Sequence, residues 1–391
     1  MKILFMTFFC GRIVVIFITK GVIPPPRMYS VFPIFLCGFL SFFLSLIFVF
    51  ATIKLAKKYN WYDEVDPRKI HKGSVPRLGG LGLFLSFCIV YVFYRLFFHN
   101  VYFDEMPFFI GGVVIWLCGI VDDFCNLRAR VKFIIQFVSI AVVVYLSPFY
   151  LDNIFSFNLP SVEIFGTQFP LLGKFLTFCW IIFLVNAFNL IDGIDWLCSG
   201  ICLFAIGTIG FLFITNQINA SFPIILCGSI LGFMVFNKPS AKIFLGDGGS
   251  QTLGYCVAVI PLFLNQGIVS ELKIIIMILL AVIPGTDVIA AIWRRLREHR
   301  SIFSTDRGHI HHKLLNIGFT KLSALLYLLI LQFMTCLAIC ISQYLGLVGA
   351  NVLLIGTFII IVIFFVSIHF LNRYVNKKGK GLLSENAQKE H

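Results

Sequence analysis

The chain has 391 residues, of which 59% are hydrophobic and only 13% are charged. A soluble domain carries about a quarter charged residues, and the 46 phenylalanines are far more than one soluble core needs. The composition therefore excludes an ordinary soluble enzyme and predicts an all-α integral membrane protein that crosses a lipid bilayer many times. The formal net charge of +13 would also suit a nucleic-acid partner. The positions of the charged residues along the chain distinguish such a partner from the positive cytoplasmic loops of a membrane protein.

Eleven apolar segments along the chain predict membrane-spanning helices. A helix needs about 20 largely apolar residues to cross a bilayer, and several of these segments are short or run close to their neighbours. We therefore predict about 11 transmembrane helices, with errors of a few residues at their boundaries. In chain order, the predicted helices are residues 29–53, 78–98, 106–121, 132–150, 172–188, 198–215, 221–236, 250–264, 271–292, 322–342 and 347–370.

Positive charge is distributed unevenly between the two sets of loops. The loops after the odd-numbered predicted helices hold most of the Lys and Arg residues, with dense groups in 54–77 and 293–321. Cytoplasmic loops of membrane proteins collect these cations, so this set is assigned to the cytoplasm. This placement explains the net charge without a nucleic-acid partner. The opposite loops contain no Lys or Arg; they are residues 99–105, 151–171, 216–220, 265–270 and 343–346.

The N-terminal segment 1–27 fits the pattern poorly. Arg12 interrupts its apolar run, and no clean small-x-small cleavage site of the kind that ends a signal peptide follows. An interfacial segment and an extension upstream of a start at Met28 are the favoured interpretations, and a weak twelfth span is the third. We therefore divide the chain into an extension (1–27), a polytopic membrane domain (28–372) and a cytoplasmic tail (373–391).

Acidic and amide side chains gather at the cytoplasmic ends of three predicted helices. Carboxylates at a membrane edge are costly and are functional candidates by default. They are Asp122 and Asp123 in "GIVDDFCN", Asn186, Asn189, Asp192 and Asp195 in "NAFNLIDGIDWL", and Asp247 in "KIFLGDGGSQ". Hard oxygen ligands of this kind suit Mg²⁺ or Mn²⁺ better than zinc. The sequence therefore predicts an active site in the cytoplasmic loops.

Cations occur in the same set of loops. Lys69 and Lys72 lie in "PRKIHKGSVPRLGG", and Arg128, Arg130 and Lys132 follow the aspartate pair. Carboxylates for a divalent ion, with Lys and Arg nearby, are the groups that bind phosphates or a diphosphate. The glycines of "LGDGGS" allow the backbone to approach a ligand closely, although without a following GKS/T they do not form a P-loop.

Each of these patterns also has a purely structural interpretation. An aspartate pair with nearby cations is typical of a helix end, Asn, Asp and Gly are turn residues, and "RRLREHR" is typical of a cytoplasmic anchor. Their coincidence on one face of a membrane protein favours a single site over these separate explanations.

Three histidines lie close together in "TDRGHIHHKL": His309, His311 and His312. Such a density suggests zinc, but no Cys lies in this loop, and the twelve cysteines form no CxxC pair. With Arg300 and Arg307 nearby, we favour a loop that contacts the diphosphate or sugar of an anionic substrate, and a structural loop or a zinc site is the alternative. If protonated histidines bind phosphate, donor affinity is expected to fall as pH rises.

Taken together, these stretches resemble the polyprenyl-phosphate N-acetylhexosamine-1-phosphate transferases. The matching pieces follow the family's order over about residues 30–370: "PRKIHKGSVPRLGG", "DDFCNLRARVKFIIQ", "NAFNLIDGIDWL", "FLGDGGS" and "HRSIFSTDRGHIHHKL". The last piece resembles the bacterial branch that starts O-antigen, enterobacterial common antigen or teichoic-acid linkage synthesis. The resemblance implies a multi-pass protein of the bacterial inner (cytoplasmic) membrane. It also implies transfer of a sugar-1-phosphate from a UDP-sugar to undecaprenyl phosphate, with Mg²⁺ or Mn²⁺ and release of UMP.

The resemblance also implies roles for individual residues. Asp247 resembles the metal ligand, and Asn189 resembles its neighbour at the metal or diphosphate. Asp192 resembles the residue that reads the uridine, and Phe244 resembles the aromatic residue under the uracil ring. The other expected site residues are the essential pair Asp122 and Asp123 near the lipid phosphate and the substrate contacts Lys69, Lys132, Asn186, Arg307, His309, His311 and His312.

Two features depart from the family's pattern. The family usually reads DGxDGL, whereas Trp196 replaces the last glycine here and puts a bulky ring next to Asp195. Residues 1–27 lie outside the pattern. UDP-GlcNAc is the expected donor, with UDP-GalNAc, UDP-QuiNAc and UDP-FucNAc as alternatives, and a homodimer is a further expectation. A transporter or a non-catalytic scaffold remains as another functional class, although a transporter is expected to place charges near the midplane and on both sides.

Overall fold

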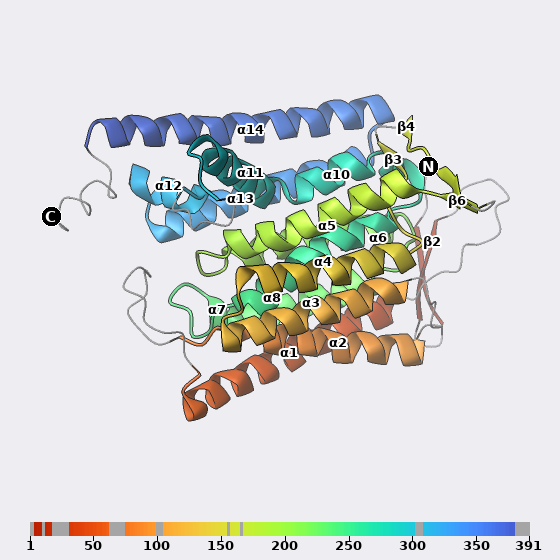
Figure 1. Ribbon diagram of the computed structural model, residues 1–391. Helices are drawn as coiled ribbons and strands as arrows, with labels where there is room; N and C mark the ends of the chain where they lie inside the picture. The colour runs from red at the N-terminus through yellow and green to blue at the C-terminus, as the bar shows by residue number, and fades with distance from the viewer. Residues whose placement is uncertain are drawn as a thin grey trace.

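The computed structural model describes residues 4–9, 12–17, 31–61, 75–98, 105–154, 157–164, 167–301 and 308–379. These residues form a bundle of helices, most of which run roughly along one common direction (Figure 1). The helices are α1 Val31–Tyr59, α2 Gly79–Phe98, α3 Met106–Cys125, α4 Ala129–Leu146, α5 Leu171–Ile191, α6 Leu197–Thr215, α7 Ser221–Asn237, α8 Gly246–Val259, η2 Ile260–Phe263, α9 Gly267–Glu271, α10 Lys273–Leu280, α11 Val282–Arg297, α12 Ile310–Ile317, α13 Lys321–Ser342 and α14 Leu347–Lys377.

Each of the eleven predicted spans coincides with one helix or with two consecutive helices of the structure, so the all-α class is confirmed. The count of eleven is not confirmed. Within the described part of the chain, eight helices are long and apolar enough to cross a membrane, or nine if the bent pair α10–α11 counts as one span. The remaining two predicted spans correspond to shorter elements: α7 has 17 residues, and α8 has 14 residues before it continues into η2.

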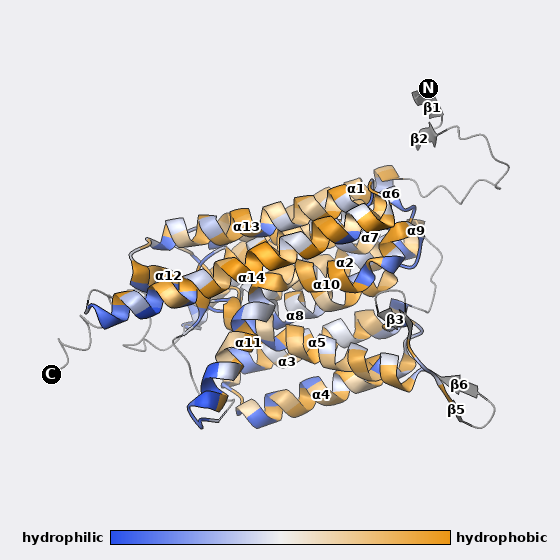
Figure 2. Ribbon diagram, turned by 90° about the horizontal axis from the view of Figure 1, so that it is seen from above, coloured by the Kyte–Doolittle hydropathy of each residue, from blue (hydrophilic) through white to orange (hydrophobic). Residues whose placement is uncertain are grey.

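Short antiparallel strand pairs accompany the helices. Strands β1 (Leu4–Phe9) and β2 (Arg12–Phe17) pair near the N-terminus. The connection between α4 and α5 contains two further pairs, β3 (Asn153–Ile154) with β4 (Phe157–Asn158) and β5 (Val162–Ile164) with β6 (Thr167–Phe169). In Figure 1 these pairs lie at one end of the bundle, and α12 lies at the other. Hydrophilic residues concentrate at helix ends, most visibly around α11 and α12 (Figure 2).

Helix α8 lies inside the bundle, where every residue from Gly248 to Val259 is buried. Glycines allow this close packing. A Cβ atom on Gly80 of α2 would collide with the backbone of Gly249, and one on Gly119 of α3 would lie 2.5 Å from the Cα atom of Gly248. Real Cβ atoms do not approach other atoms this closely, so small residues at these crossings let α2 and α3 press against the start of α8. The residue before Gly248 is Asp247, which is thereby placed beside the end of α3.

The predicted span 271–292 is broken in the structure. Helices α10 and α11 meet at an angle of 73° at Ala281. Pro284 follows within the first turn of α11, and a proline has no N–H to continue the hydrogen bonding of the preceding helix. The break turns α11 away from the direction of α10, and α11 then carries the chain to the histidine segment on α12.

Candidate functional site

The end of α3 and the start of α8 are joined by the side chain of Asp123. Its two carboxylate oxygens accept hydrogen bonds from the backbone N–H groups of Asp247 (2.8 Å) and Gly248 (2.9 Å). These are first-turn N–H groups that have no partner within the helix, and a carboxylate also suits the positive end of the helix dipole. Gly246 makes the turn with a φ of +74°. Asp123 therefore fixes the backbone that carries Asp247.

Two aspartates converge on one lysine. The ammonium of Lys132 on α4 lies 3.0 Å from Oδ2 of Asp122 and also contacts Oδ2 of Asp247. Asp122 further accepts the backbone N–H of Leu127 at 2.7 Å, in a turn that Asn126 makes in the left-handed conformation. All three charged side chains are largely shielded, with exposed fractions of 16% for Lys132, 13% for Asp122 and 27% for Asp247. The sequence prediction that these residues share one site is consistent with this geometry.

A chain of amide side chains supports Asp247 from within the bundle. The Gln251 amide donates to Oδ2 of Asp247 at 3.0 Å. Gln136 of α4 donates to the oxygen of Gln251 at 2.8 Å, and Asn186 of α5 donates to the oxygen of Gln136 at 3.2 Å. Gln136 and Gln251 are fully buried. Side chains from three helices thus hold the Asp247 carboxylate in place. Asn186 does not touch this carboxylate, because Gln136 and Gln251 lie between them.

Asn189 lies next to Asp247 in the same site. Its amide nitrogen donates to the hydroxyl of Ser250 at 3.0 Å, and the amide also interacts with the Asp247 carboxylate. Because Asn186 and Asn189 are separated by about one helical turn, they lie on the same face of α5, where Asn189 meets Ser250 of α8 and Asn186 meets Gln136 of α4.

The loop after α5 carries Asp192 and Asp195. Burial, followed by the negative charge of Asp247, raises the pKa of Asp192 to about 7. Asp195 instead accepts the backbone N–H of Ala241 at 3.2 Å, which ties this loop to the segment between α7 and α8. The structure therefore gives Asp195 a contact that stabilises the loop.

Trp196 adopts the backbone conformation that explains the family's glycine at this position. Its φ is +69°, in the left-handed region that residues other than glycine rarely adopt. Two contacts hold it there: its backbone N–H donates to Oδ1 of Asn237 at 3.0 Å, and its indole N–H donates to the carbonyl of Met234 at 2.7 Å. The indole is thereby anchored to α7, and the tryptophan serves the fold of the loop.

Phe244 lies in the segment between α7 and α8. Its backbone N–H donates to the carbonyl of Pro76 at 2.8 Å, and its carbonyl accepts the N–H of Gly79 at 2.9 Å. The last residues of the predicted lysine motif "PRKIHKGSVPRLGG", which include Pro76 and Gly79, thus run alongside the start of the "FLGDGGS" motif. Lys69 and Arg307, two further predicted substrate contacts, lie outside the described residues.

The histidine segment forms the start of α12. His309 and His311 are buried, with exposed fractions of 6% and 3%, whereas His312 is half-buried. The rings of His309 and His311 are nearly parallel at 6.0 Å, and those of His311 and His312 are 4.3 Å apart. A Cβ atom on Gly193 would collide with the His311 ring, so α12 packs directly against the loop that carries Asp192. The histidine segment therefore lies beside the loop that carries Asp192.

Burial changes what His311 can do. Its pKa is lowered to about 3, first by loss of water and second by the neighbouring His312. The ring is therefore neutral near pH 7. Binding of phosphate by a protonated ring, the condition for the expected fall in donor affinity with rising pH, therefore does not apply to His311 near pH 7.

Sequence reasoning missed Asp287 of α11. This side chain is 1% exposed and bonds both Nδ1 of His309 (2.9 Å) and the backbone N–H of Ile310 (2.8 Å). A carboxylate inside an otherwise apolar predicted span is itself a signal, and that signal was present in "PGTDVIAA". The buried amides Gln136 and Gln251 were also missed.

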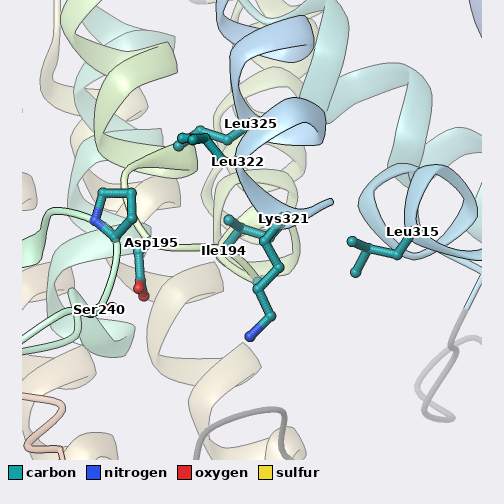
Figure 3. A pocket seen from close by; sticks show the side chains of 9 residues that line it. Ile194, Asp195, Ser240, Leu315, Lys321, Leu322 and Leu325 are labelled. Atoms are coloured by element: carbon teal, nitrogen blue, oxygen red, sulfur yellow. The ribbon is translucent and has the colours of Figure 1, made fainter. Parts of the chain in front are cut away.

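A pocket of about 220 Å³ adjoins this region. Its walls come from the loop after α5, the segment after α7, α12 and α13. In the view of Figure 3 the charged groups of Asp195 and Lys321 lie below Leu322 and Leu325. Gly193 belongs both to this pocket and to the contact with His311. The pocket therefore borders the predicted site.

The side chains present fit a magnesium ion of the kind that binds phosphates. Mg²⁺ typically uses one or two carboxylates, keeps several waters and takes further oxygens from phosphate groups. The carboxylates of Asp122 and Asp247 already converge on a cation, the Lys132 ammonium, and Asn189 has an amide oxygen beside them. Among the residues that the structure describes, no three His, Cys, Asp or Glu side chains gather as a complete metal site.

Known proteins share these sequence features over most of the chain. A family model described as "Glycosyl transferase family 4" matches residues 106–265. The chain is 30% identical over 303 residues to a probable undecaprenyl-phosphate N-acetylglucosaminyl 1-phosphate transferase of Bacillus subtilis (strain 168), a match that covers 76% of this chain and 81% of the relative. This chain belongs to the polyprenyl-phosphate N-acetylhexosamine-1-phosphate transferase family. Its several long apolar helices agree with the multi-pass membrane architecture.

Other relatives carry closely related names. The chain is 28% identical over 291 residues to an undecaprenyl-phosphate alpha-N-acetylglucosaminyl 1-phosphate transferase of Salmonella typhi, covering 72% of this chain and 77% of the relative. It is 26% identical over 337 residues to the protein of the same name from Yersinia pestis, covering 83% and 86%. The family assigned from the sequence motifs is therefore confirmed.

Proposed function

We propose that this transferase moves N-acetylglucosamine-1-phosphate from UDP-GlcNAc to undecaprenyl phosphate. An oxygen of the lipid phosphate attacks the β-phosphorus of the donor, the bond from this phosphorus to the bridging oxygen breaks, and UMP leaves. We further propose that the protein lies in the bacterial inner membrane with the site facing the cytoplasm. The names of the relatives support the lipid acceptor and the GlcNAc-1-phosphate group, and the uneven distribution of Lys and Arg between the loops supports the orientation.

The convergence of Asp122, Lys132 and Asp247 is the observation that carries this proposal. Phosphoryl transfer depends mainly on positioning and electrostatic stabilisation. A lysine held between two carboxylates can bind a phosphate oxygen when one carboxylate engages a metal, and the surrounding helices exclude much of the water.

Each charged residue of the site has its own proposed role. Lys132 binds a phosphate oxygen of the diphosphate or of the lipid. Asp122 accepts the proton of the lipid phosphate or orients it, and Asp123 holds the backbone of Asp247 in position. Asp192 accepts a hydrogen bond from the uracil ring. The histidine segment then covers the donor beside this loop.

Mg²⁺, with Mn²⁺ as an alternative, is the proposed cofactor. Asp247 and the amide oxygen of Asn189 would hold it, and when bound it neutralises charge on the diphosphate. The amide chain from Gln251 to Asn186 keeps the Asp247 carboxylate oriented toward this position. The same oxygen-rich set of donors offers none of the soft ligands that zinc prefers.

Purified protein tests the proposal directly. With labelled UDP-GlcNAc, Mg²⁺ and undecaprenyl phosphate, the transferase releases UMP and forms a lipid-linked sugar diphosphate in equal amounts. A transporter or a scaffold would release no UMP. Competition with UDP-GalNAc, UDP-QuiNAc and UDP-FucNAc then identifies the donor, and preferred use of one of these would replace GlcNAc in the proposal. Mass measurement of the purified particle tests for the homodimer.

A covalent aspartyl-phosphate intermediate is the competing mechanism. In that mechanism a carboxylate attacks the donor first, so UMP is released before any lipid is present. Incubation with donor and Mg²⁺ without undecaprenyl phosphate distinguishes the two. Direct attack predicts no stoichiometric UMP burst and no phosphorylated protein, and trapping of such a species would overturn it.

A further inference from the structure

Asp287 and His309 form a buried pair that joins two helices across a loop. Asp287 lies on α11, six residues after the break at Ala281, and His309 immediately precedes α12. The carboxylate oxygen Oδ2 lies 2.9 Å from Nδ1 of His309, and Oδ1 accepts the N–H of Ile310 at 2.8 Å. Their side chains are 1% and 8% exposed. A charged group at this depth is costly unless its partners are well placed.

The geometry determines which ring nitrogen is available to a ligand. A carboxylate has only acceptor oxygens, so Nδ1 of His309 carries the proton and donates it. In the neutral ring, Nε2 is then an acceptor on the opposite edge. Nδ1 of His311 is fully buried and has no hydrogen-bond partner among the described residues. Nε2 of His309 is not among the fully buried nitrogens that lack a partner.

The pair is connected to the donor side of the site. The His309 ring lies parallel to that of His311 at 6.0 Å, and His311 packs against Gly193, next to Asp192. Asp287 therefore sets the position of the His309 ring. This ring lies beside that of His311, which packs against the loop that carries Asp192, the proposed uracil-binding residue. Since His311 is neutral and packed, His309 is the better placed of the two to contact the donor.

We propose that Asp287 is a positioning residue, which holds His309 in the Nδ1–H tautomer so that Nε2 accepts a hydrogen bond from a hydroxyl or amide N–H of the UDP-sugar. The inference rests on the proposed function for the identity of the donor. It assigns Asp287 no contact with substrate. A carboxylate that is hydrogen-bonded to one ring nitrogen of a histidine fixes the tautomer and the orientation of the ring.

Asp287→Asn is the discriminating variant. The asparagine oxygen still accepts the Ile310 N–H, so the start of α12 is retained. Its NH₂ group donates to Nδ1, which forces the proton of the ring onto Nε2 and turns the acceptor into a donor. We expect the donor KM to rise roughly tenfold, with the lipid KM and kcat within about twofold of wild type, since one ligand hydrogen bond is lost.

The double variant tests whether Asp287 acts through His309. His309→Ala is expected to raise the donor KM to a similar extent, and adding Asp287→Asn to it is expected to change nothing further. Glu105→Gln is the matched control, because Glu105 is another carboxylate, bonded to Arg95 and Tyr91 away from the site. Its donor KM is expected to stay at the wild-type value. Equal effects of Asp287→Asn with and without His309 would overturn the proposal.

Two substitutions of His309 separate a ligand contact from a structural bond. Asparagine at 309 reproduces the Nδ1 donor to Asp287 but has no atom at Nε2, whereas glutamine places a polar atom near Nε2. We expect His309→Gln to bind the donor more tightly than His309→Asn. The opposite order would show that only the bond to Asp287 matters. These two variants also carry the test if Asp287→Asn does not fold.

A spectroscopic measurement makes the test independent of turnover. In full-length protein with ¹⁵N-labelled histidine, the signals lost in His309→Ala identify this ring, and their shifts report its tautomer. The Nδ1–H form is expected in wild type and the Nε2–H form in Asp287→Asn. An unchanged tautomer overturns the inference whether or not UMP is released. Absence of UMP release in wild type, with the tautomer change present, would overturn the proposed function instead.

Discussion

The carboxylate of Asp123 accepts the backbone N–H of Asp247 at 2.8 Å. Both its oxygens are engaged by the start of α8, because the second accepts the N–H of Gly248 at 2.9 Å. The adjacent Asp122 points instead to Lys132. Two neighbouring aspartates that look equivalent in the sequence thus have different partners, one with the backbone of α8 and one with the charged centre of the site.

This difference predicts different outcomes for the two asparagine variants. Asp123→Asn removes one acceptor and presents an NH₂ group to a backbone N–H, so we expect a loss of about 1–3 kcal/mol in the free energy of unfolding together with lower activity. Asp122→Asn retains an acceptor for the Leu127 N–H, so activity is expected to fall with a smaller loss of stability. Thermal unfolding and UMP release are the measurements. Full stability in an inactive Asp123→Asn would instead indicate a chemical role.

Asp247→Asn is expected to abolish nearly all activity without unfolding the protein. The asparagine oxygen still accepts from Gln251, but the negative charge beside Lys132 is lost. Because charge stabilisation at such a site is worth roughly 100- to 1,000-fold in rate, we expect a loss of kcat at least this large. UMP release and the melting temperature are compared with those of Glu105→Gln. Normal turnover would remove Asp247 from the metal site.

The buried amide chain predicts a non-additive pair of variants. Gln251→Leu leaves the amide of Gln136 without its acceptor inside the bundle, at a cost of about 1–3 kcal/mol. Gln136→Leu leaves the Gln251 oxygen without its donor. The double leucine variant removes both orphaned groups and is expected to be more stable than the sum of the single losses predicts. Strict additivity in denaturant unfolding would show that the two amides do not interact.

Trp196 predicts an unusual order of stability. Alanine at this position loses the indole but keeps the strained left-handed backbone, whereas glycine adopts that backbone without strain. We therefore expect Trp196→Gly to be about 1 kcal/mol more stable than Trp196→Ala, although both are less stable than wild type. The donor KM is expected to change little, since the indole bonds to α7. A large change in donor preference would instead make Trp196 a specificity residue.

The sequence predicted the positions of the long helices better than the contacts between them. Apolar length located the helices of the eleven predicted spans but not the short helices α9 and α12. Asn186 and Asn189 lie on one face of α5, where Asn186 bonds to Gln136 of α4 and Asn189 bonds to Ser250 of α8. The sequence did not separate Asp122 from Asp123, because their partners depend on how closely α3 approaches α8. The expected start at residue 250 also left Asp247 outside its helix, whereas it lies in the first turn. Apolar content likewise did not reveal the break at Ala281.

Two titrating groups predict how donor binding depends on pH. The raised pKa of Asp192, about 7, means that its carboxyl is largely protonated below this pH and charged above it. The lowered pKa of His311, about 3, keeps that ring neutral throughout the same range. A charged carboxylate accepts a uracil N–H more strongly than a protonated carboxyl does. Asp192 therefore favours tighter donor binding at higher pH, opposite to the direction expected from protonated histidines.

We expect the donor KM to fall as pH rises through about 7, with lipid acceptor saturating. Asp192→Asn is expected to flatten this change and to raise the KM above pH 7 roughly tenfold, because a charge-assisted hydrogen bond is replaced by a neutral one. His311→Gln serves as the control, since a ring that stays neutral cannot contribute to the slope. A wild-type KM that rises with pH, and loses this rise in His309 or His312 variants, would show that protonated histidines dominate donor binding.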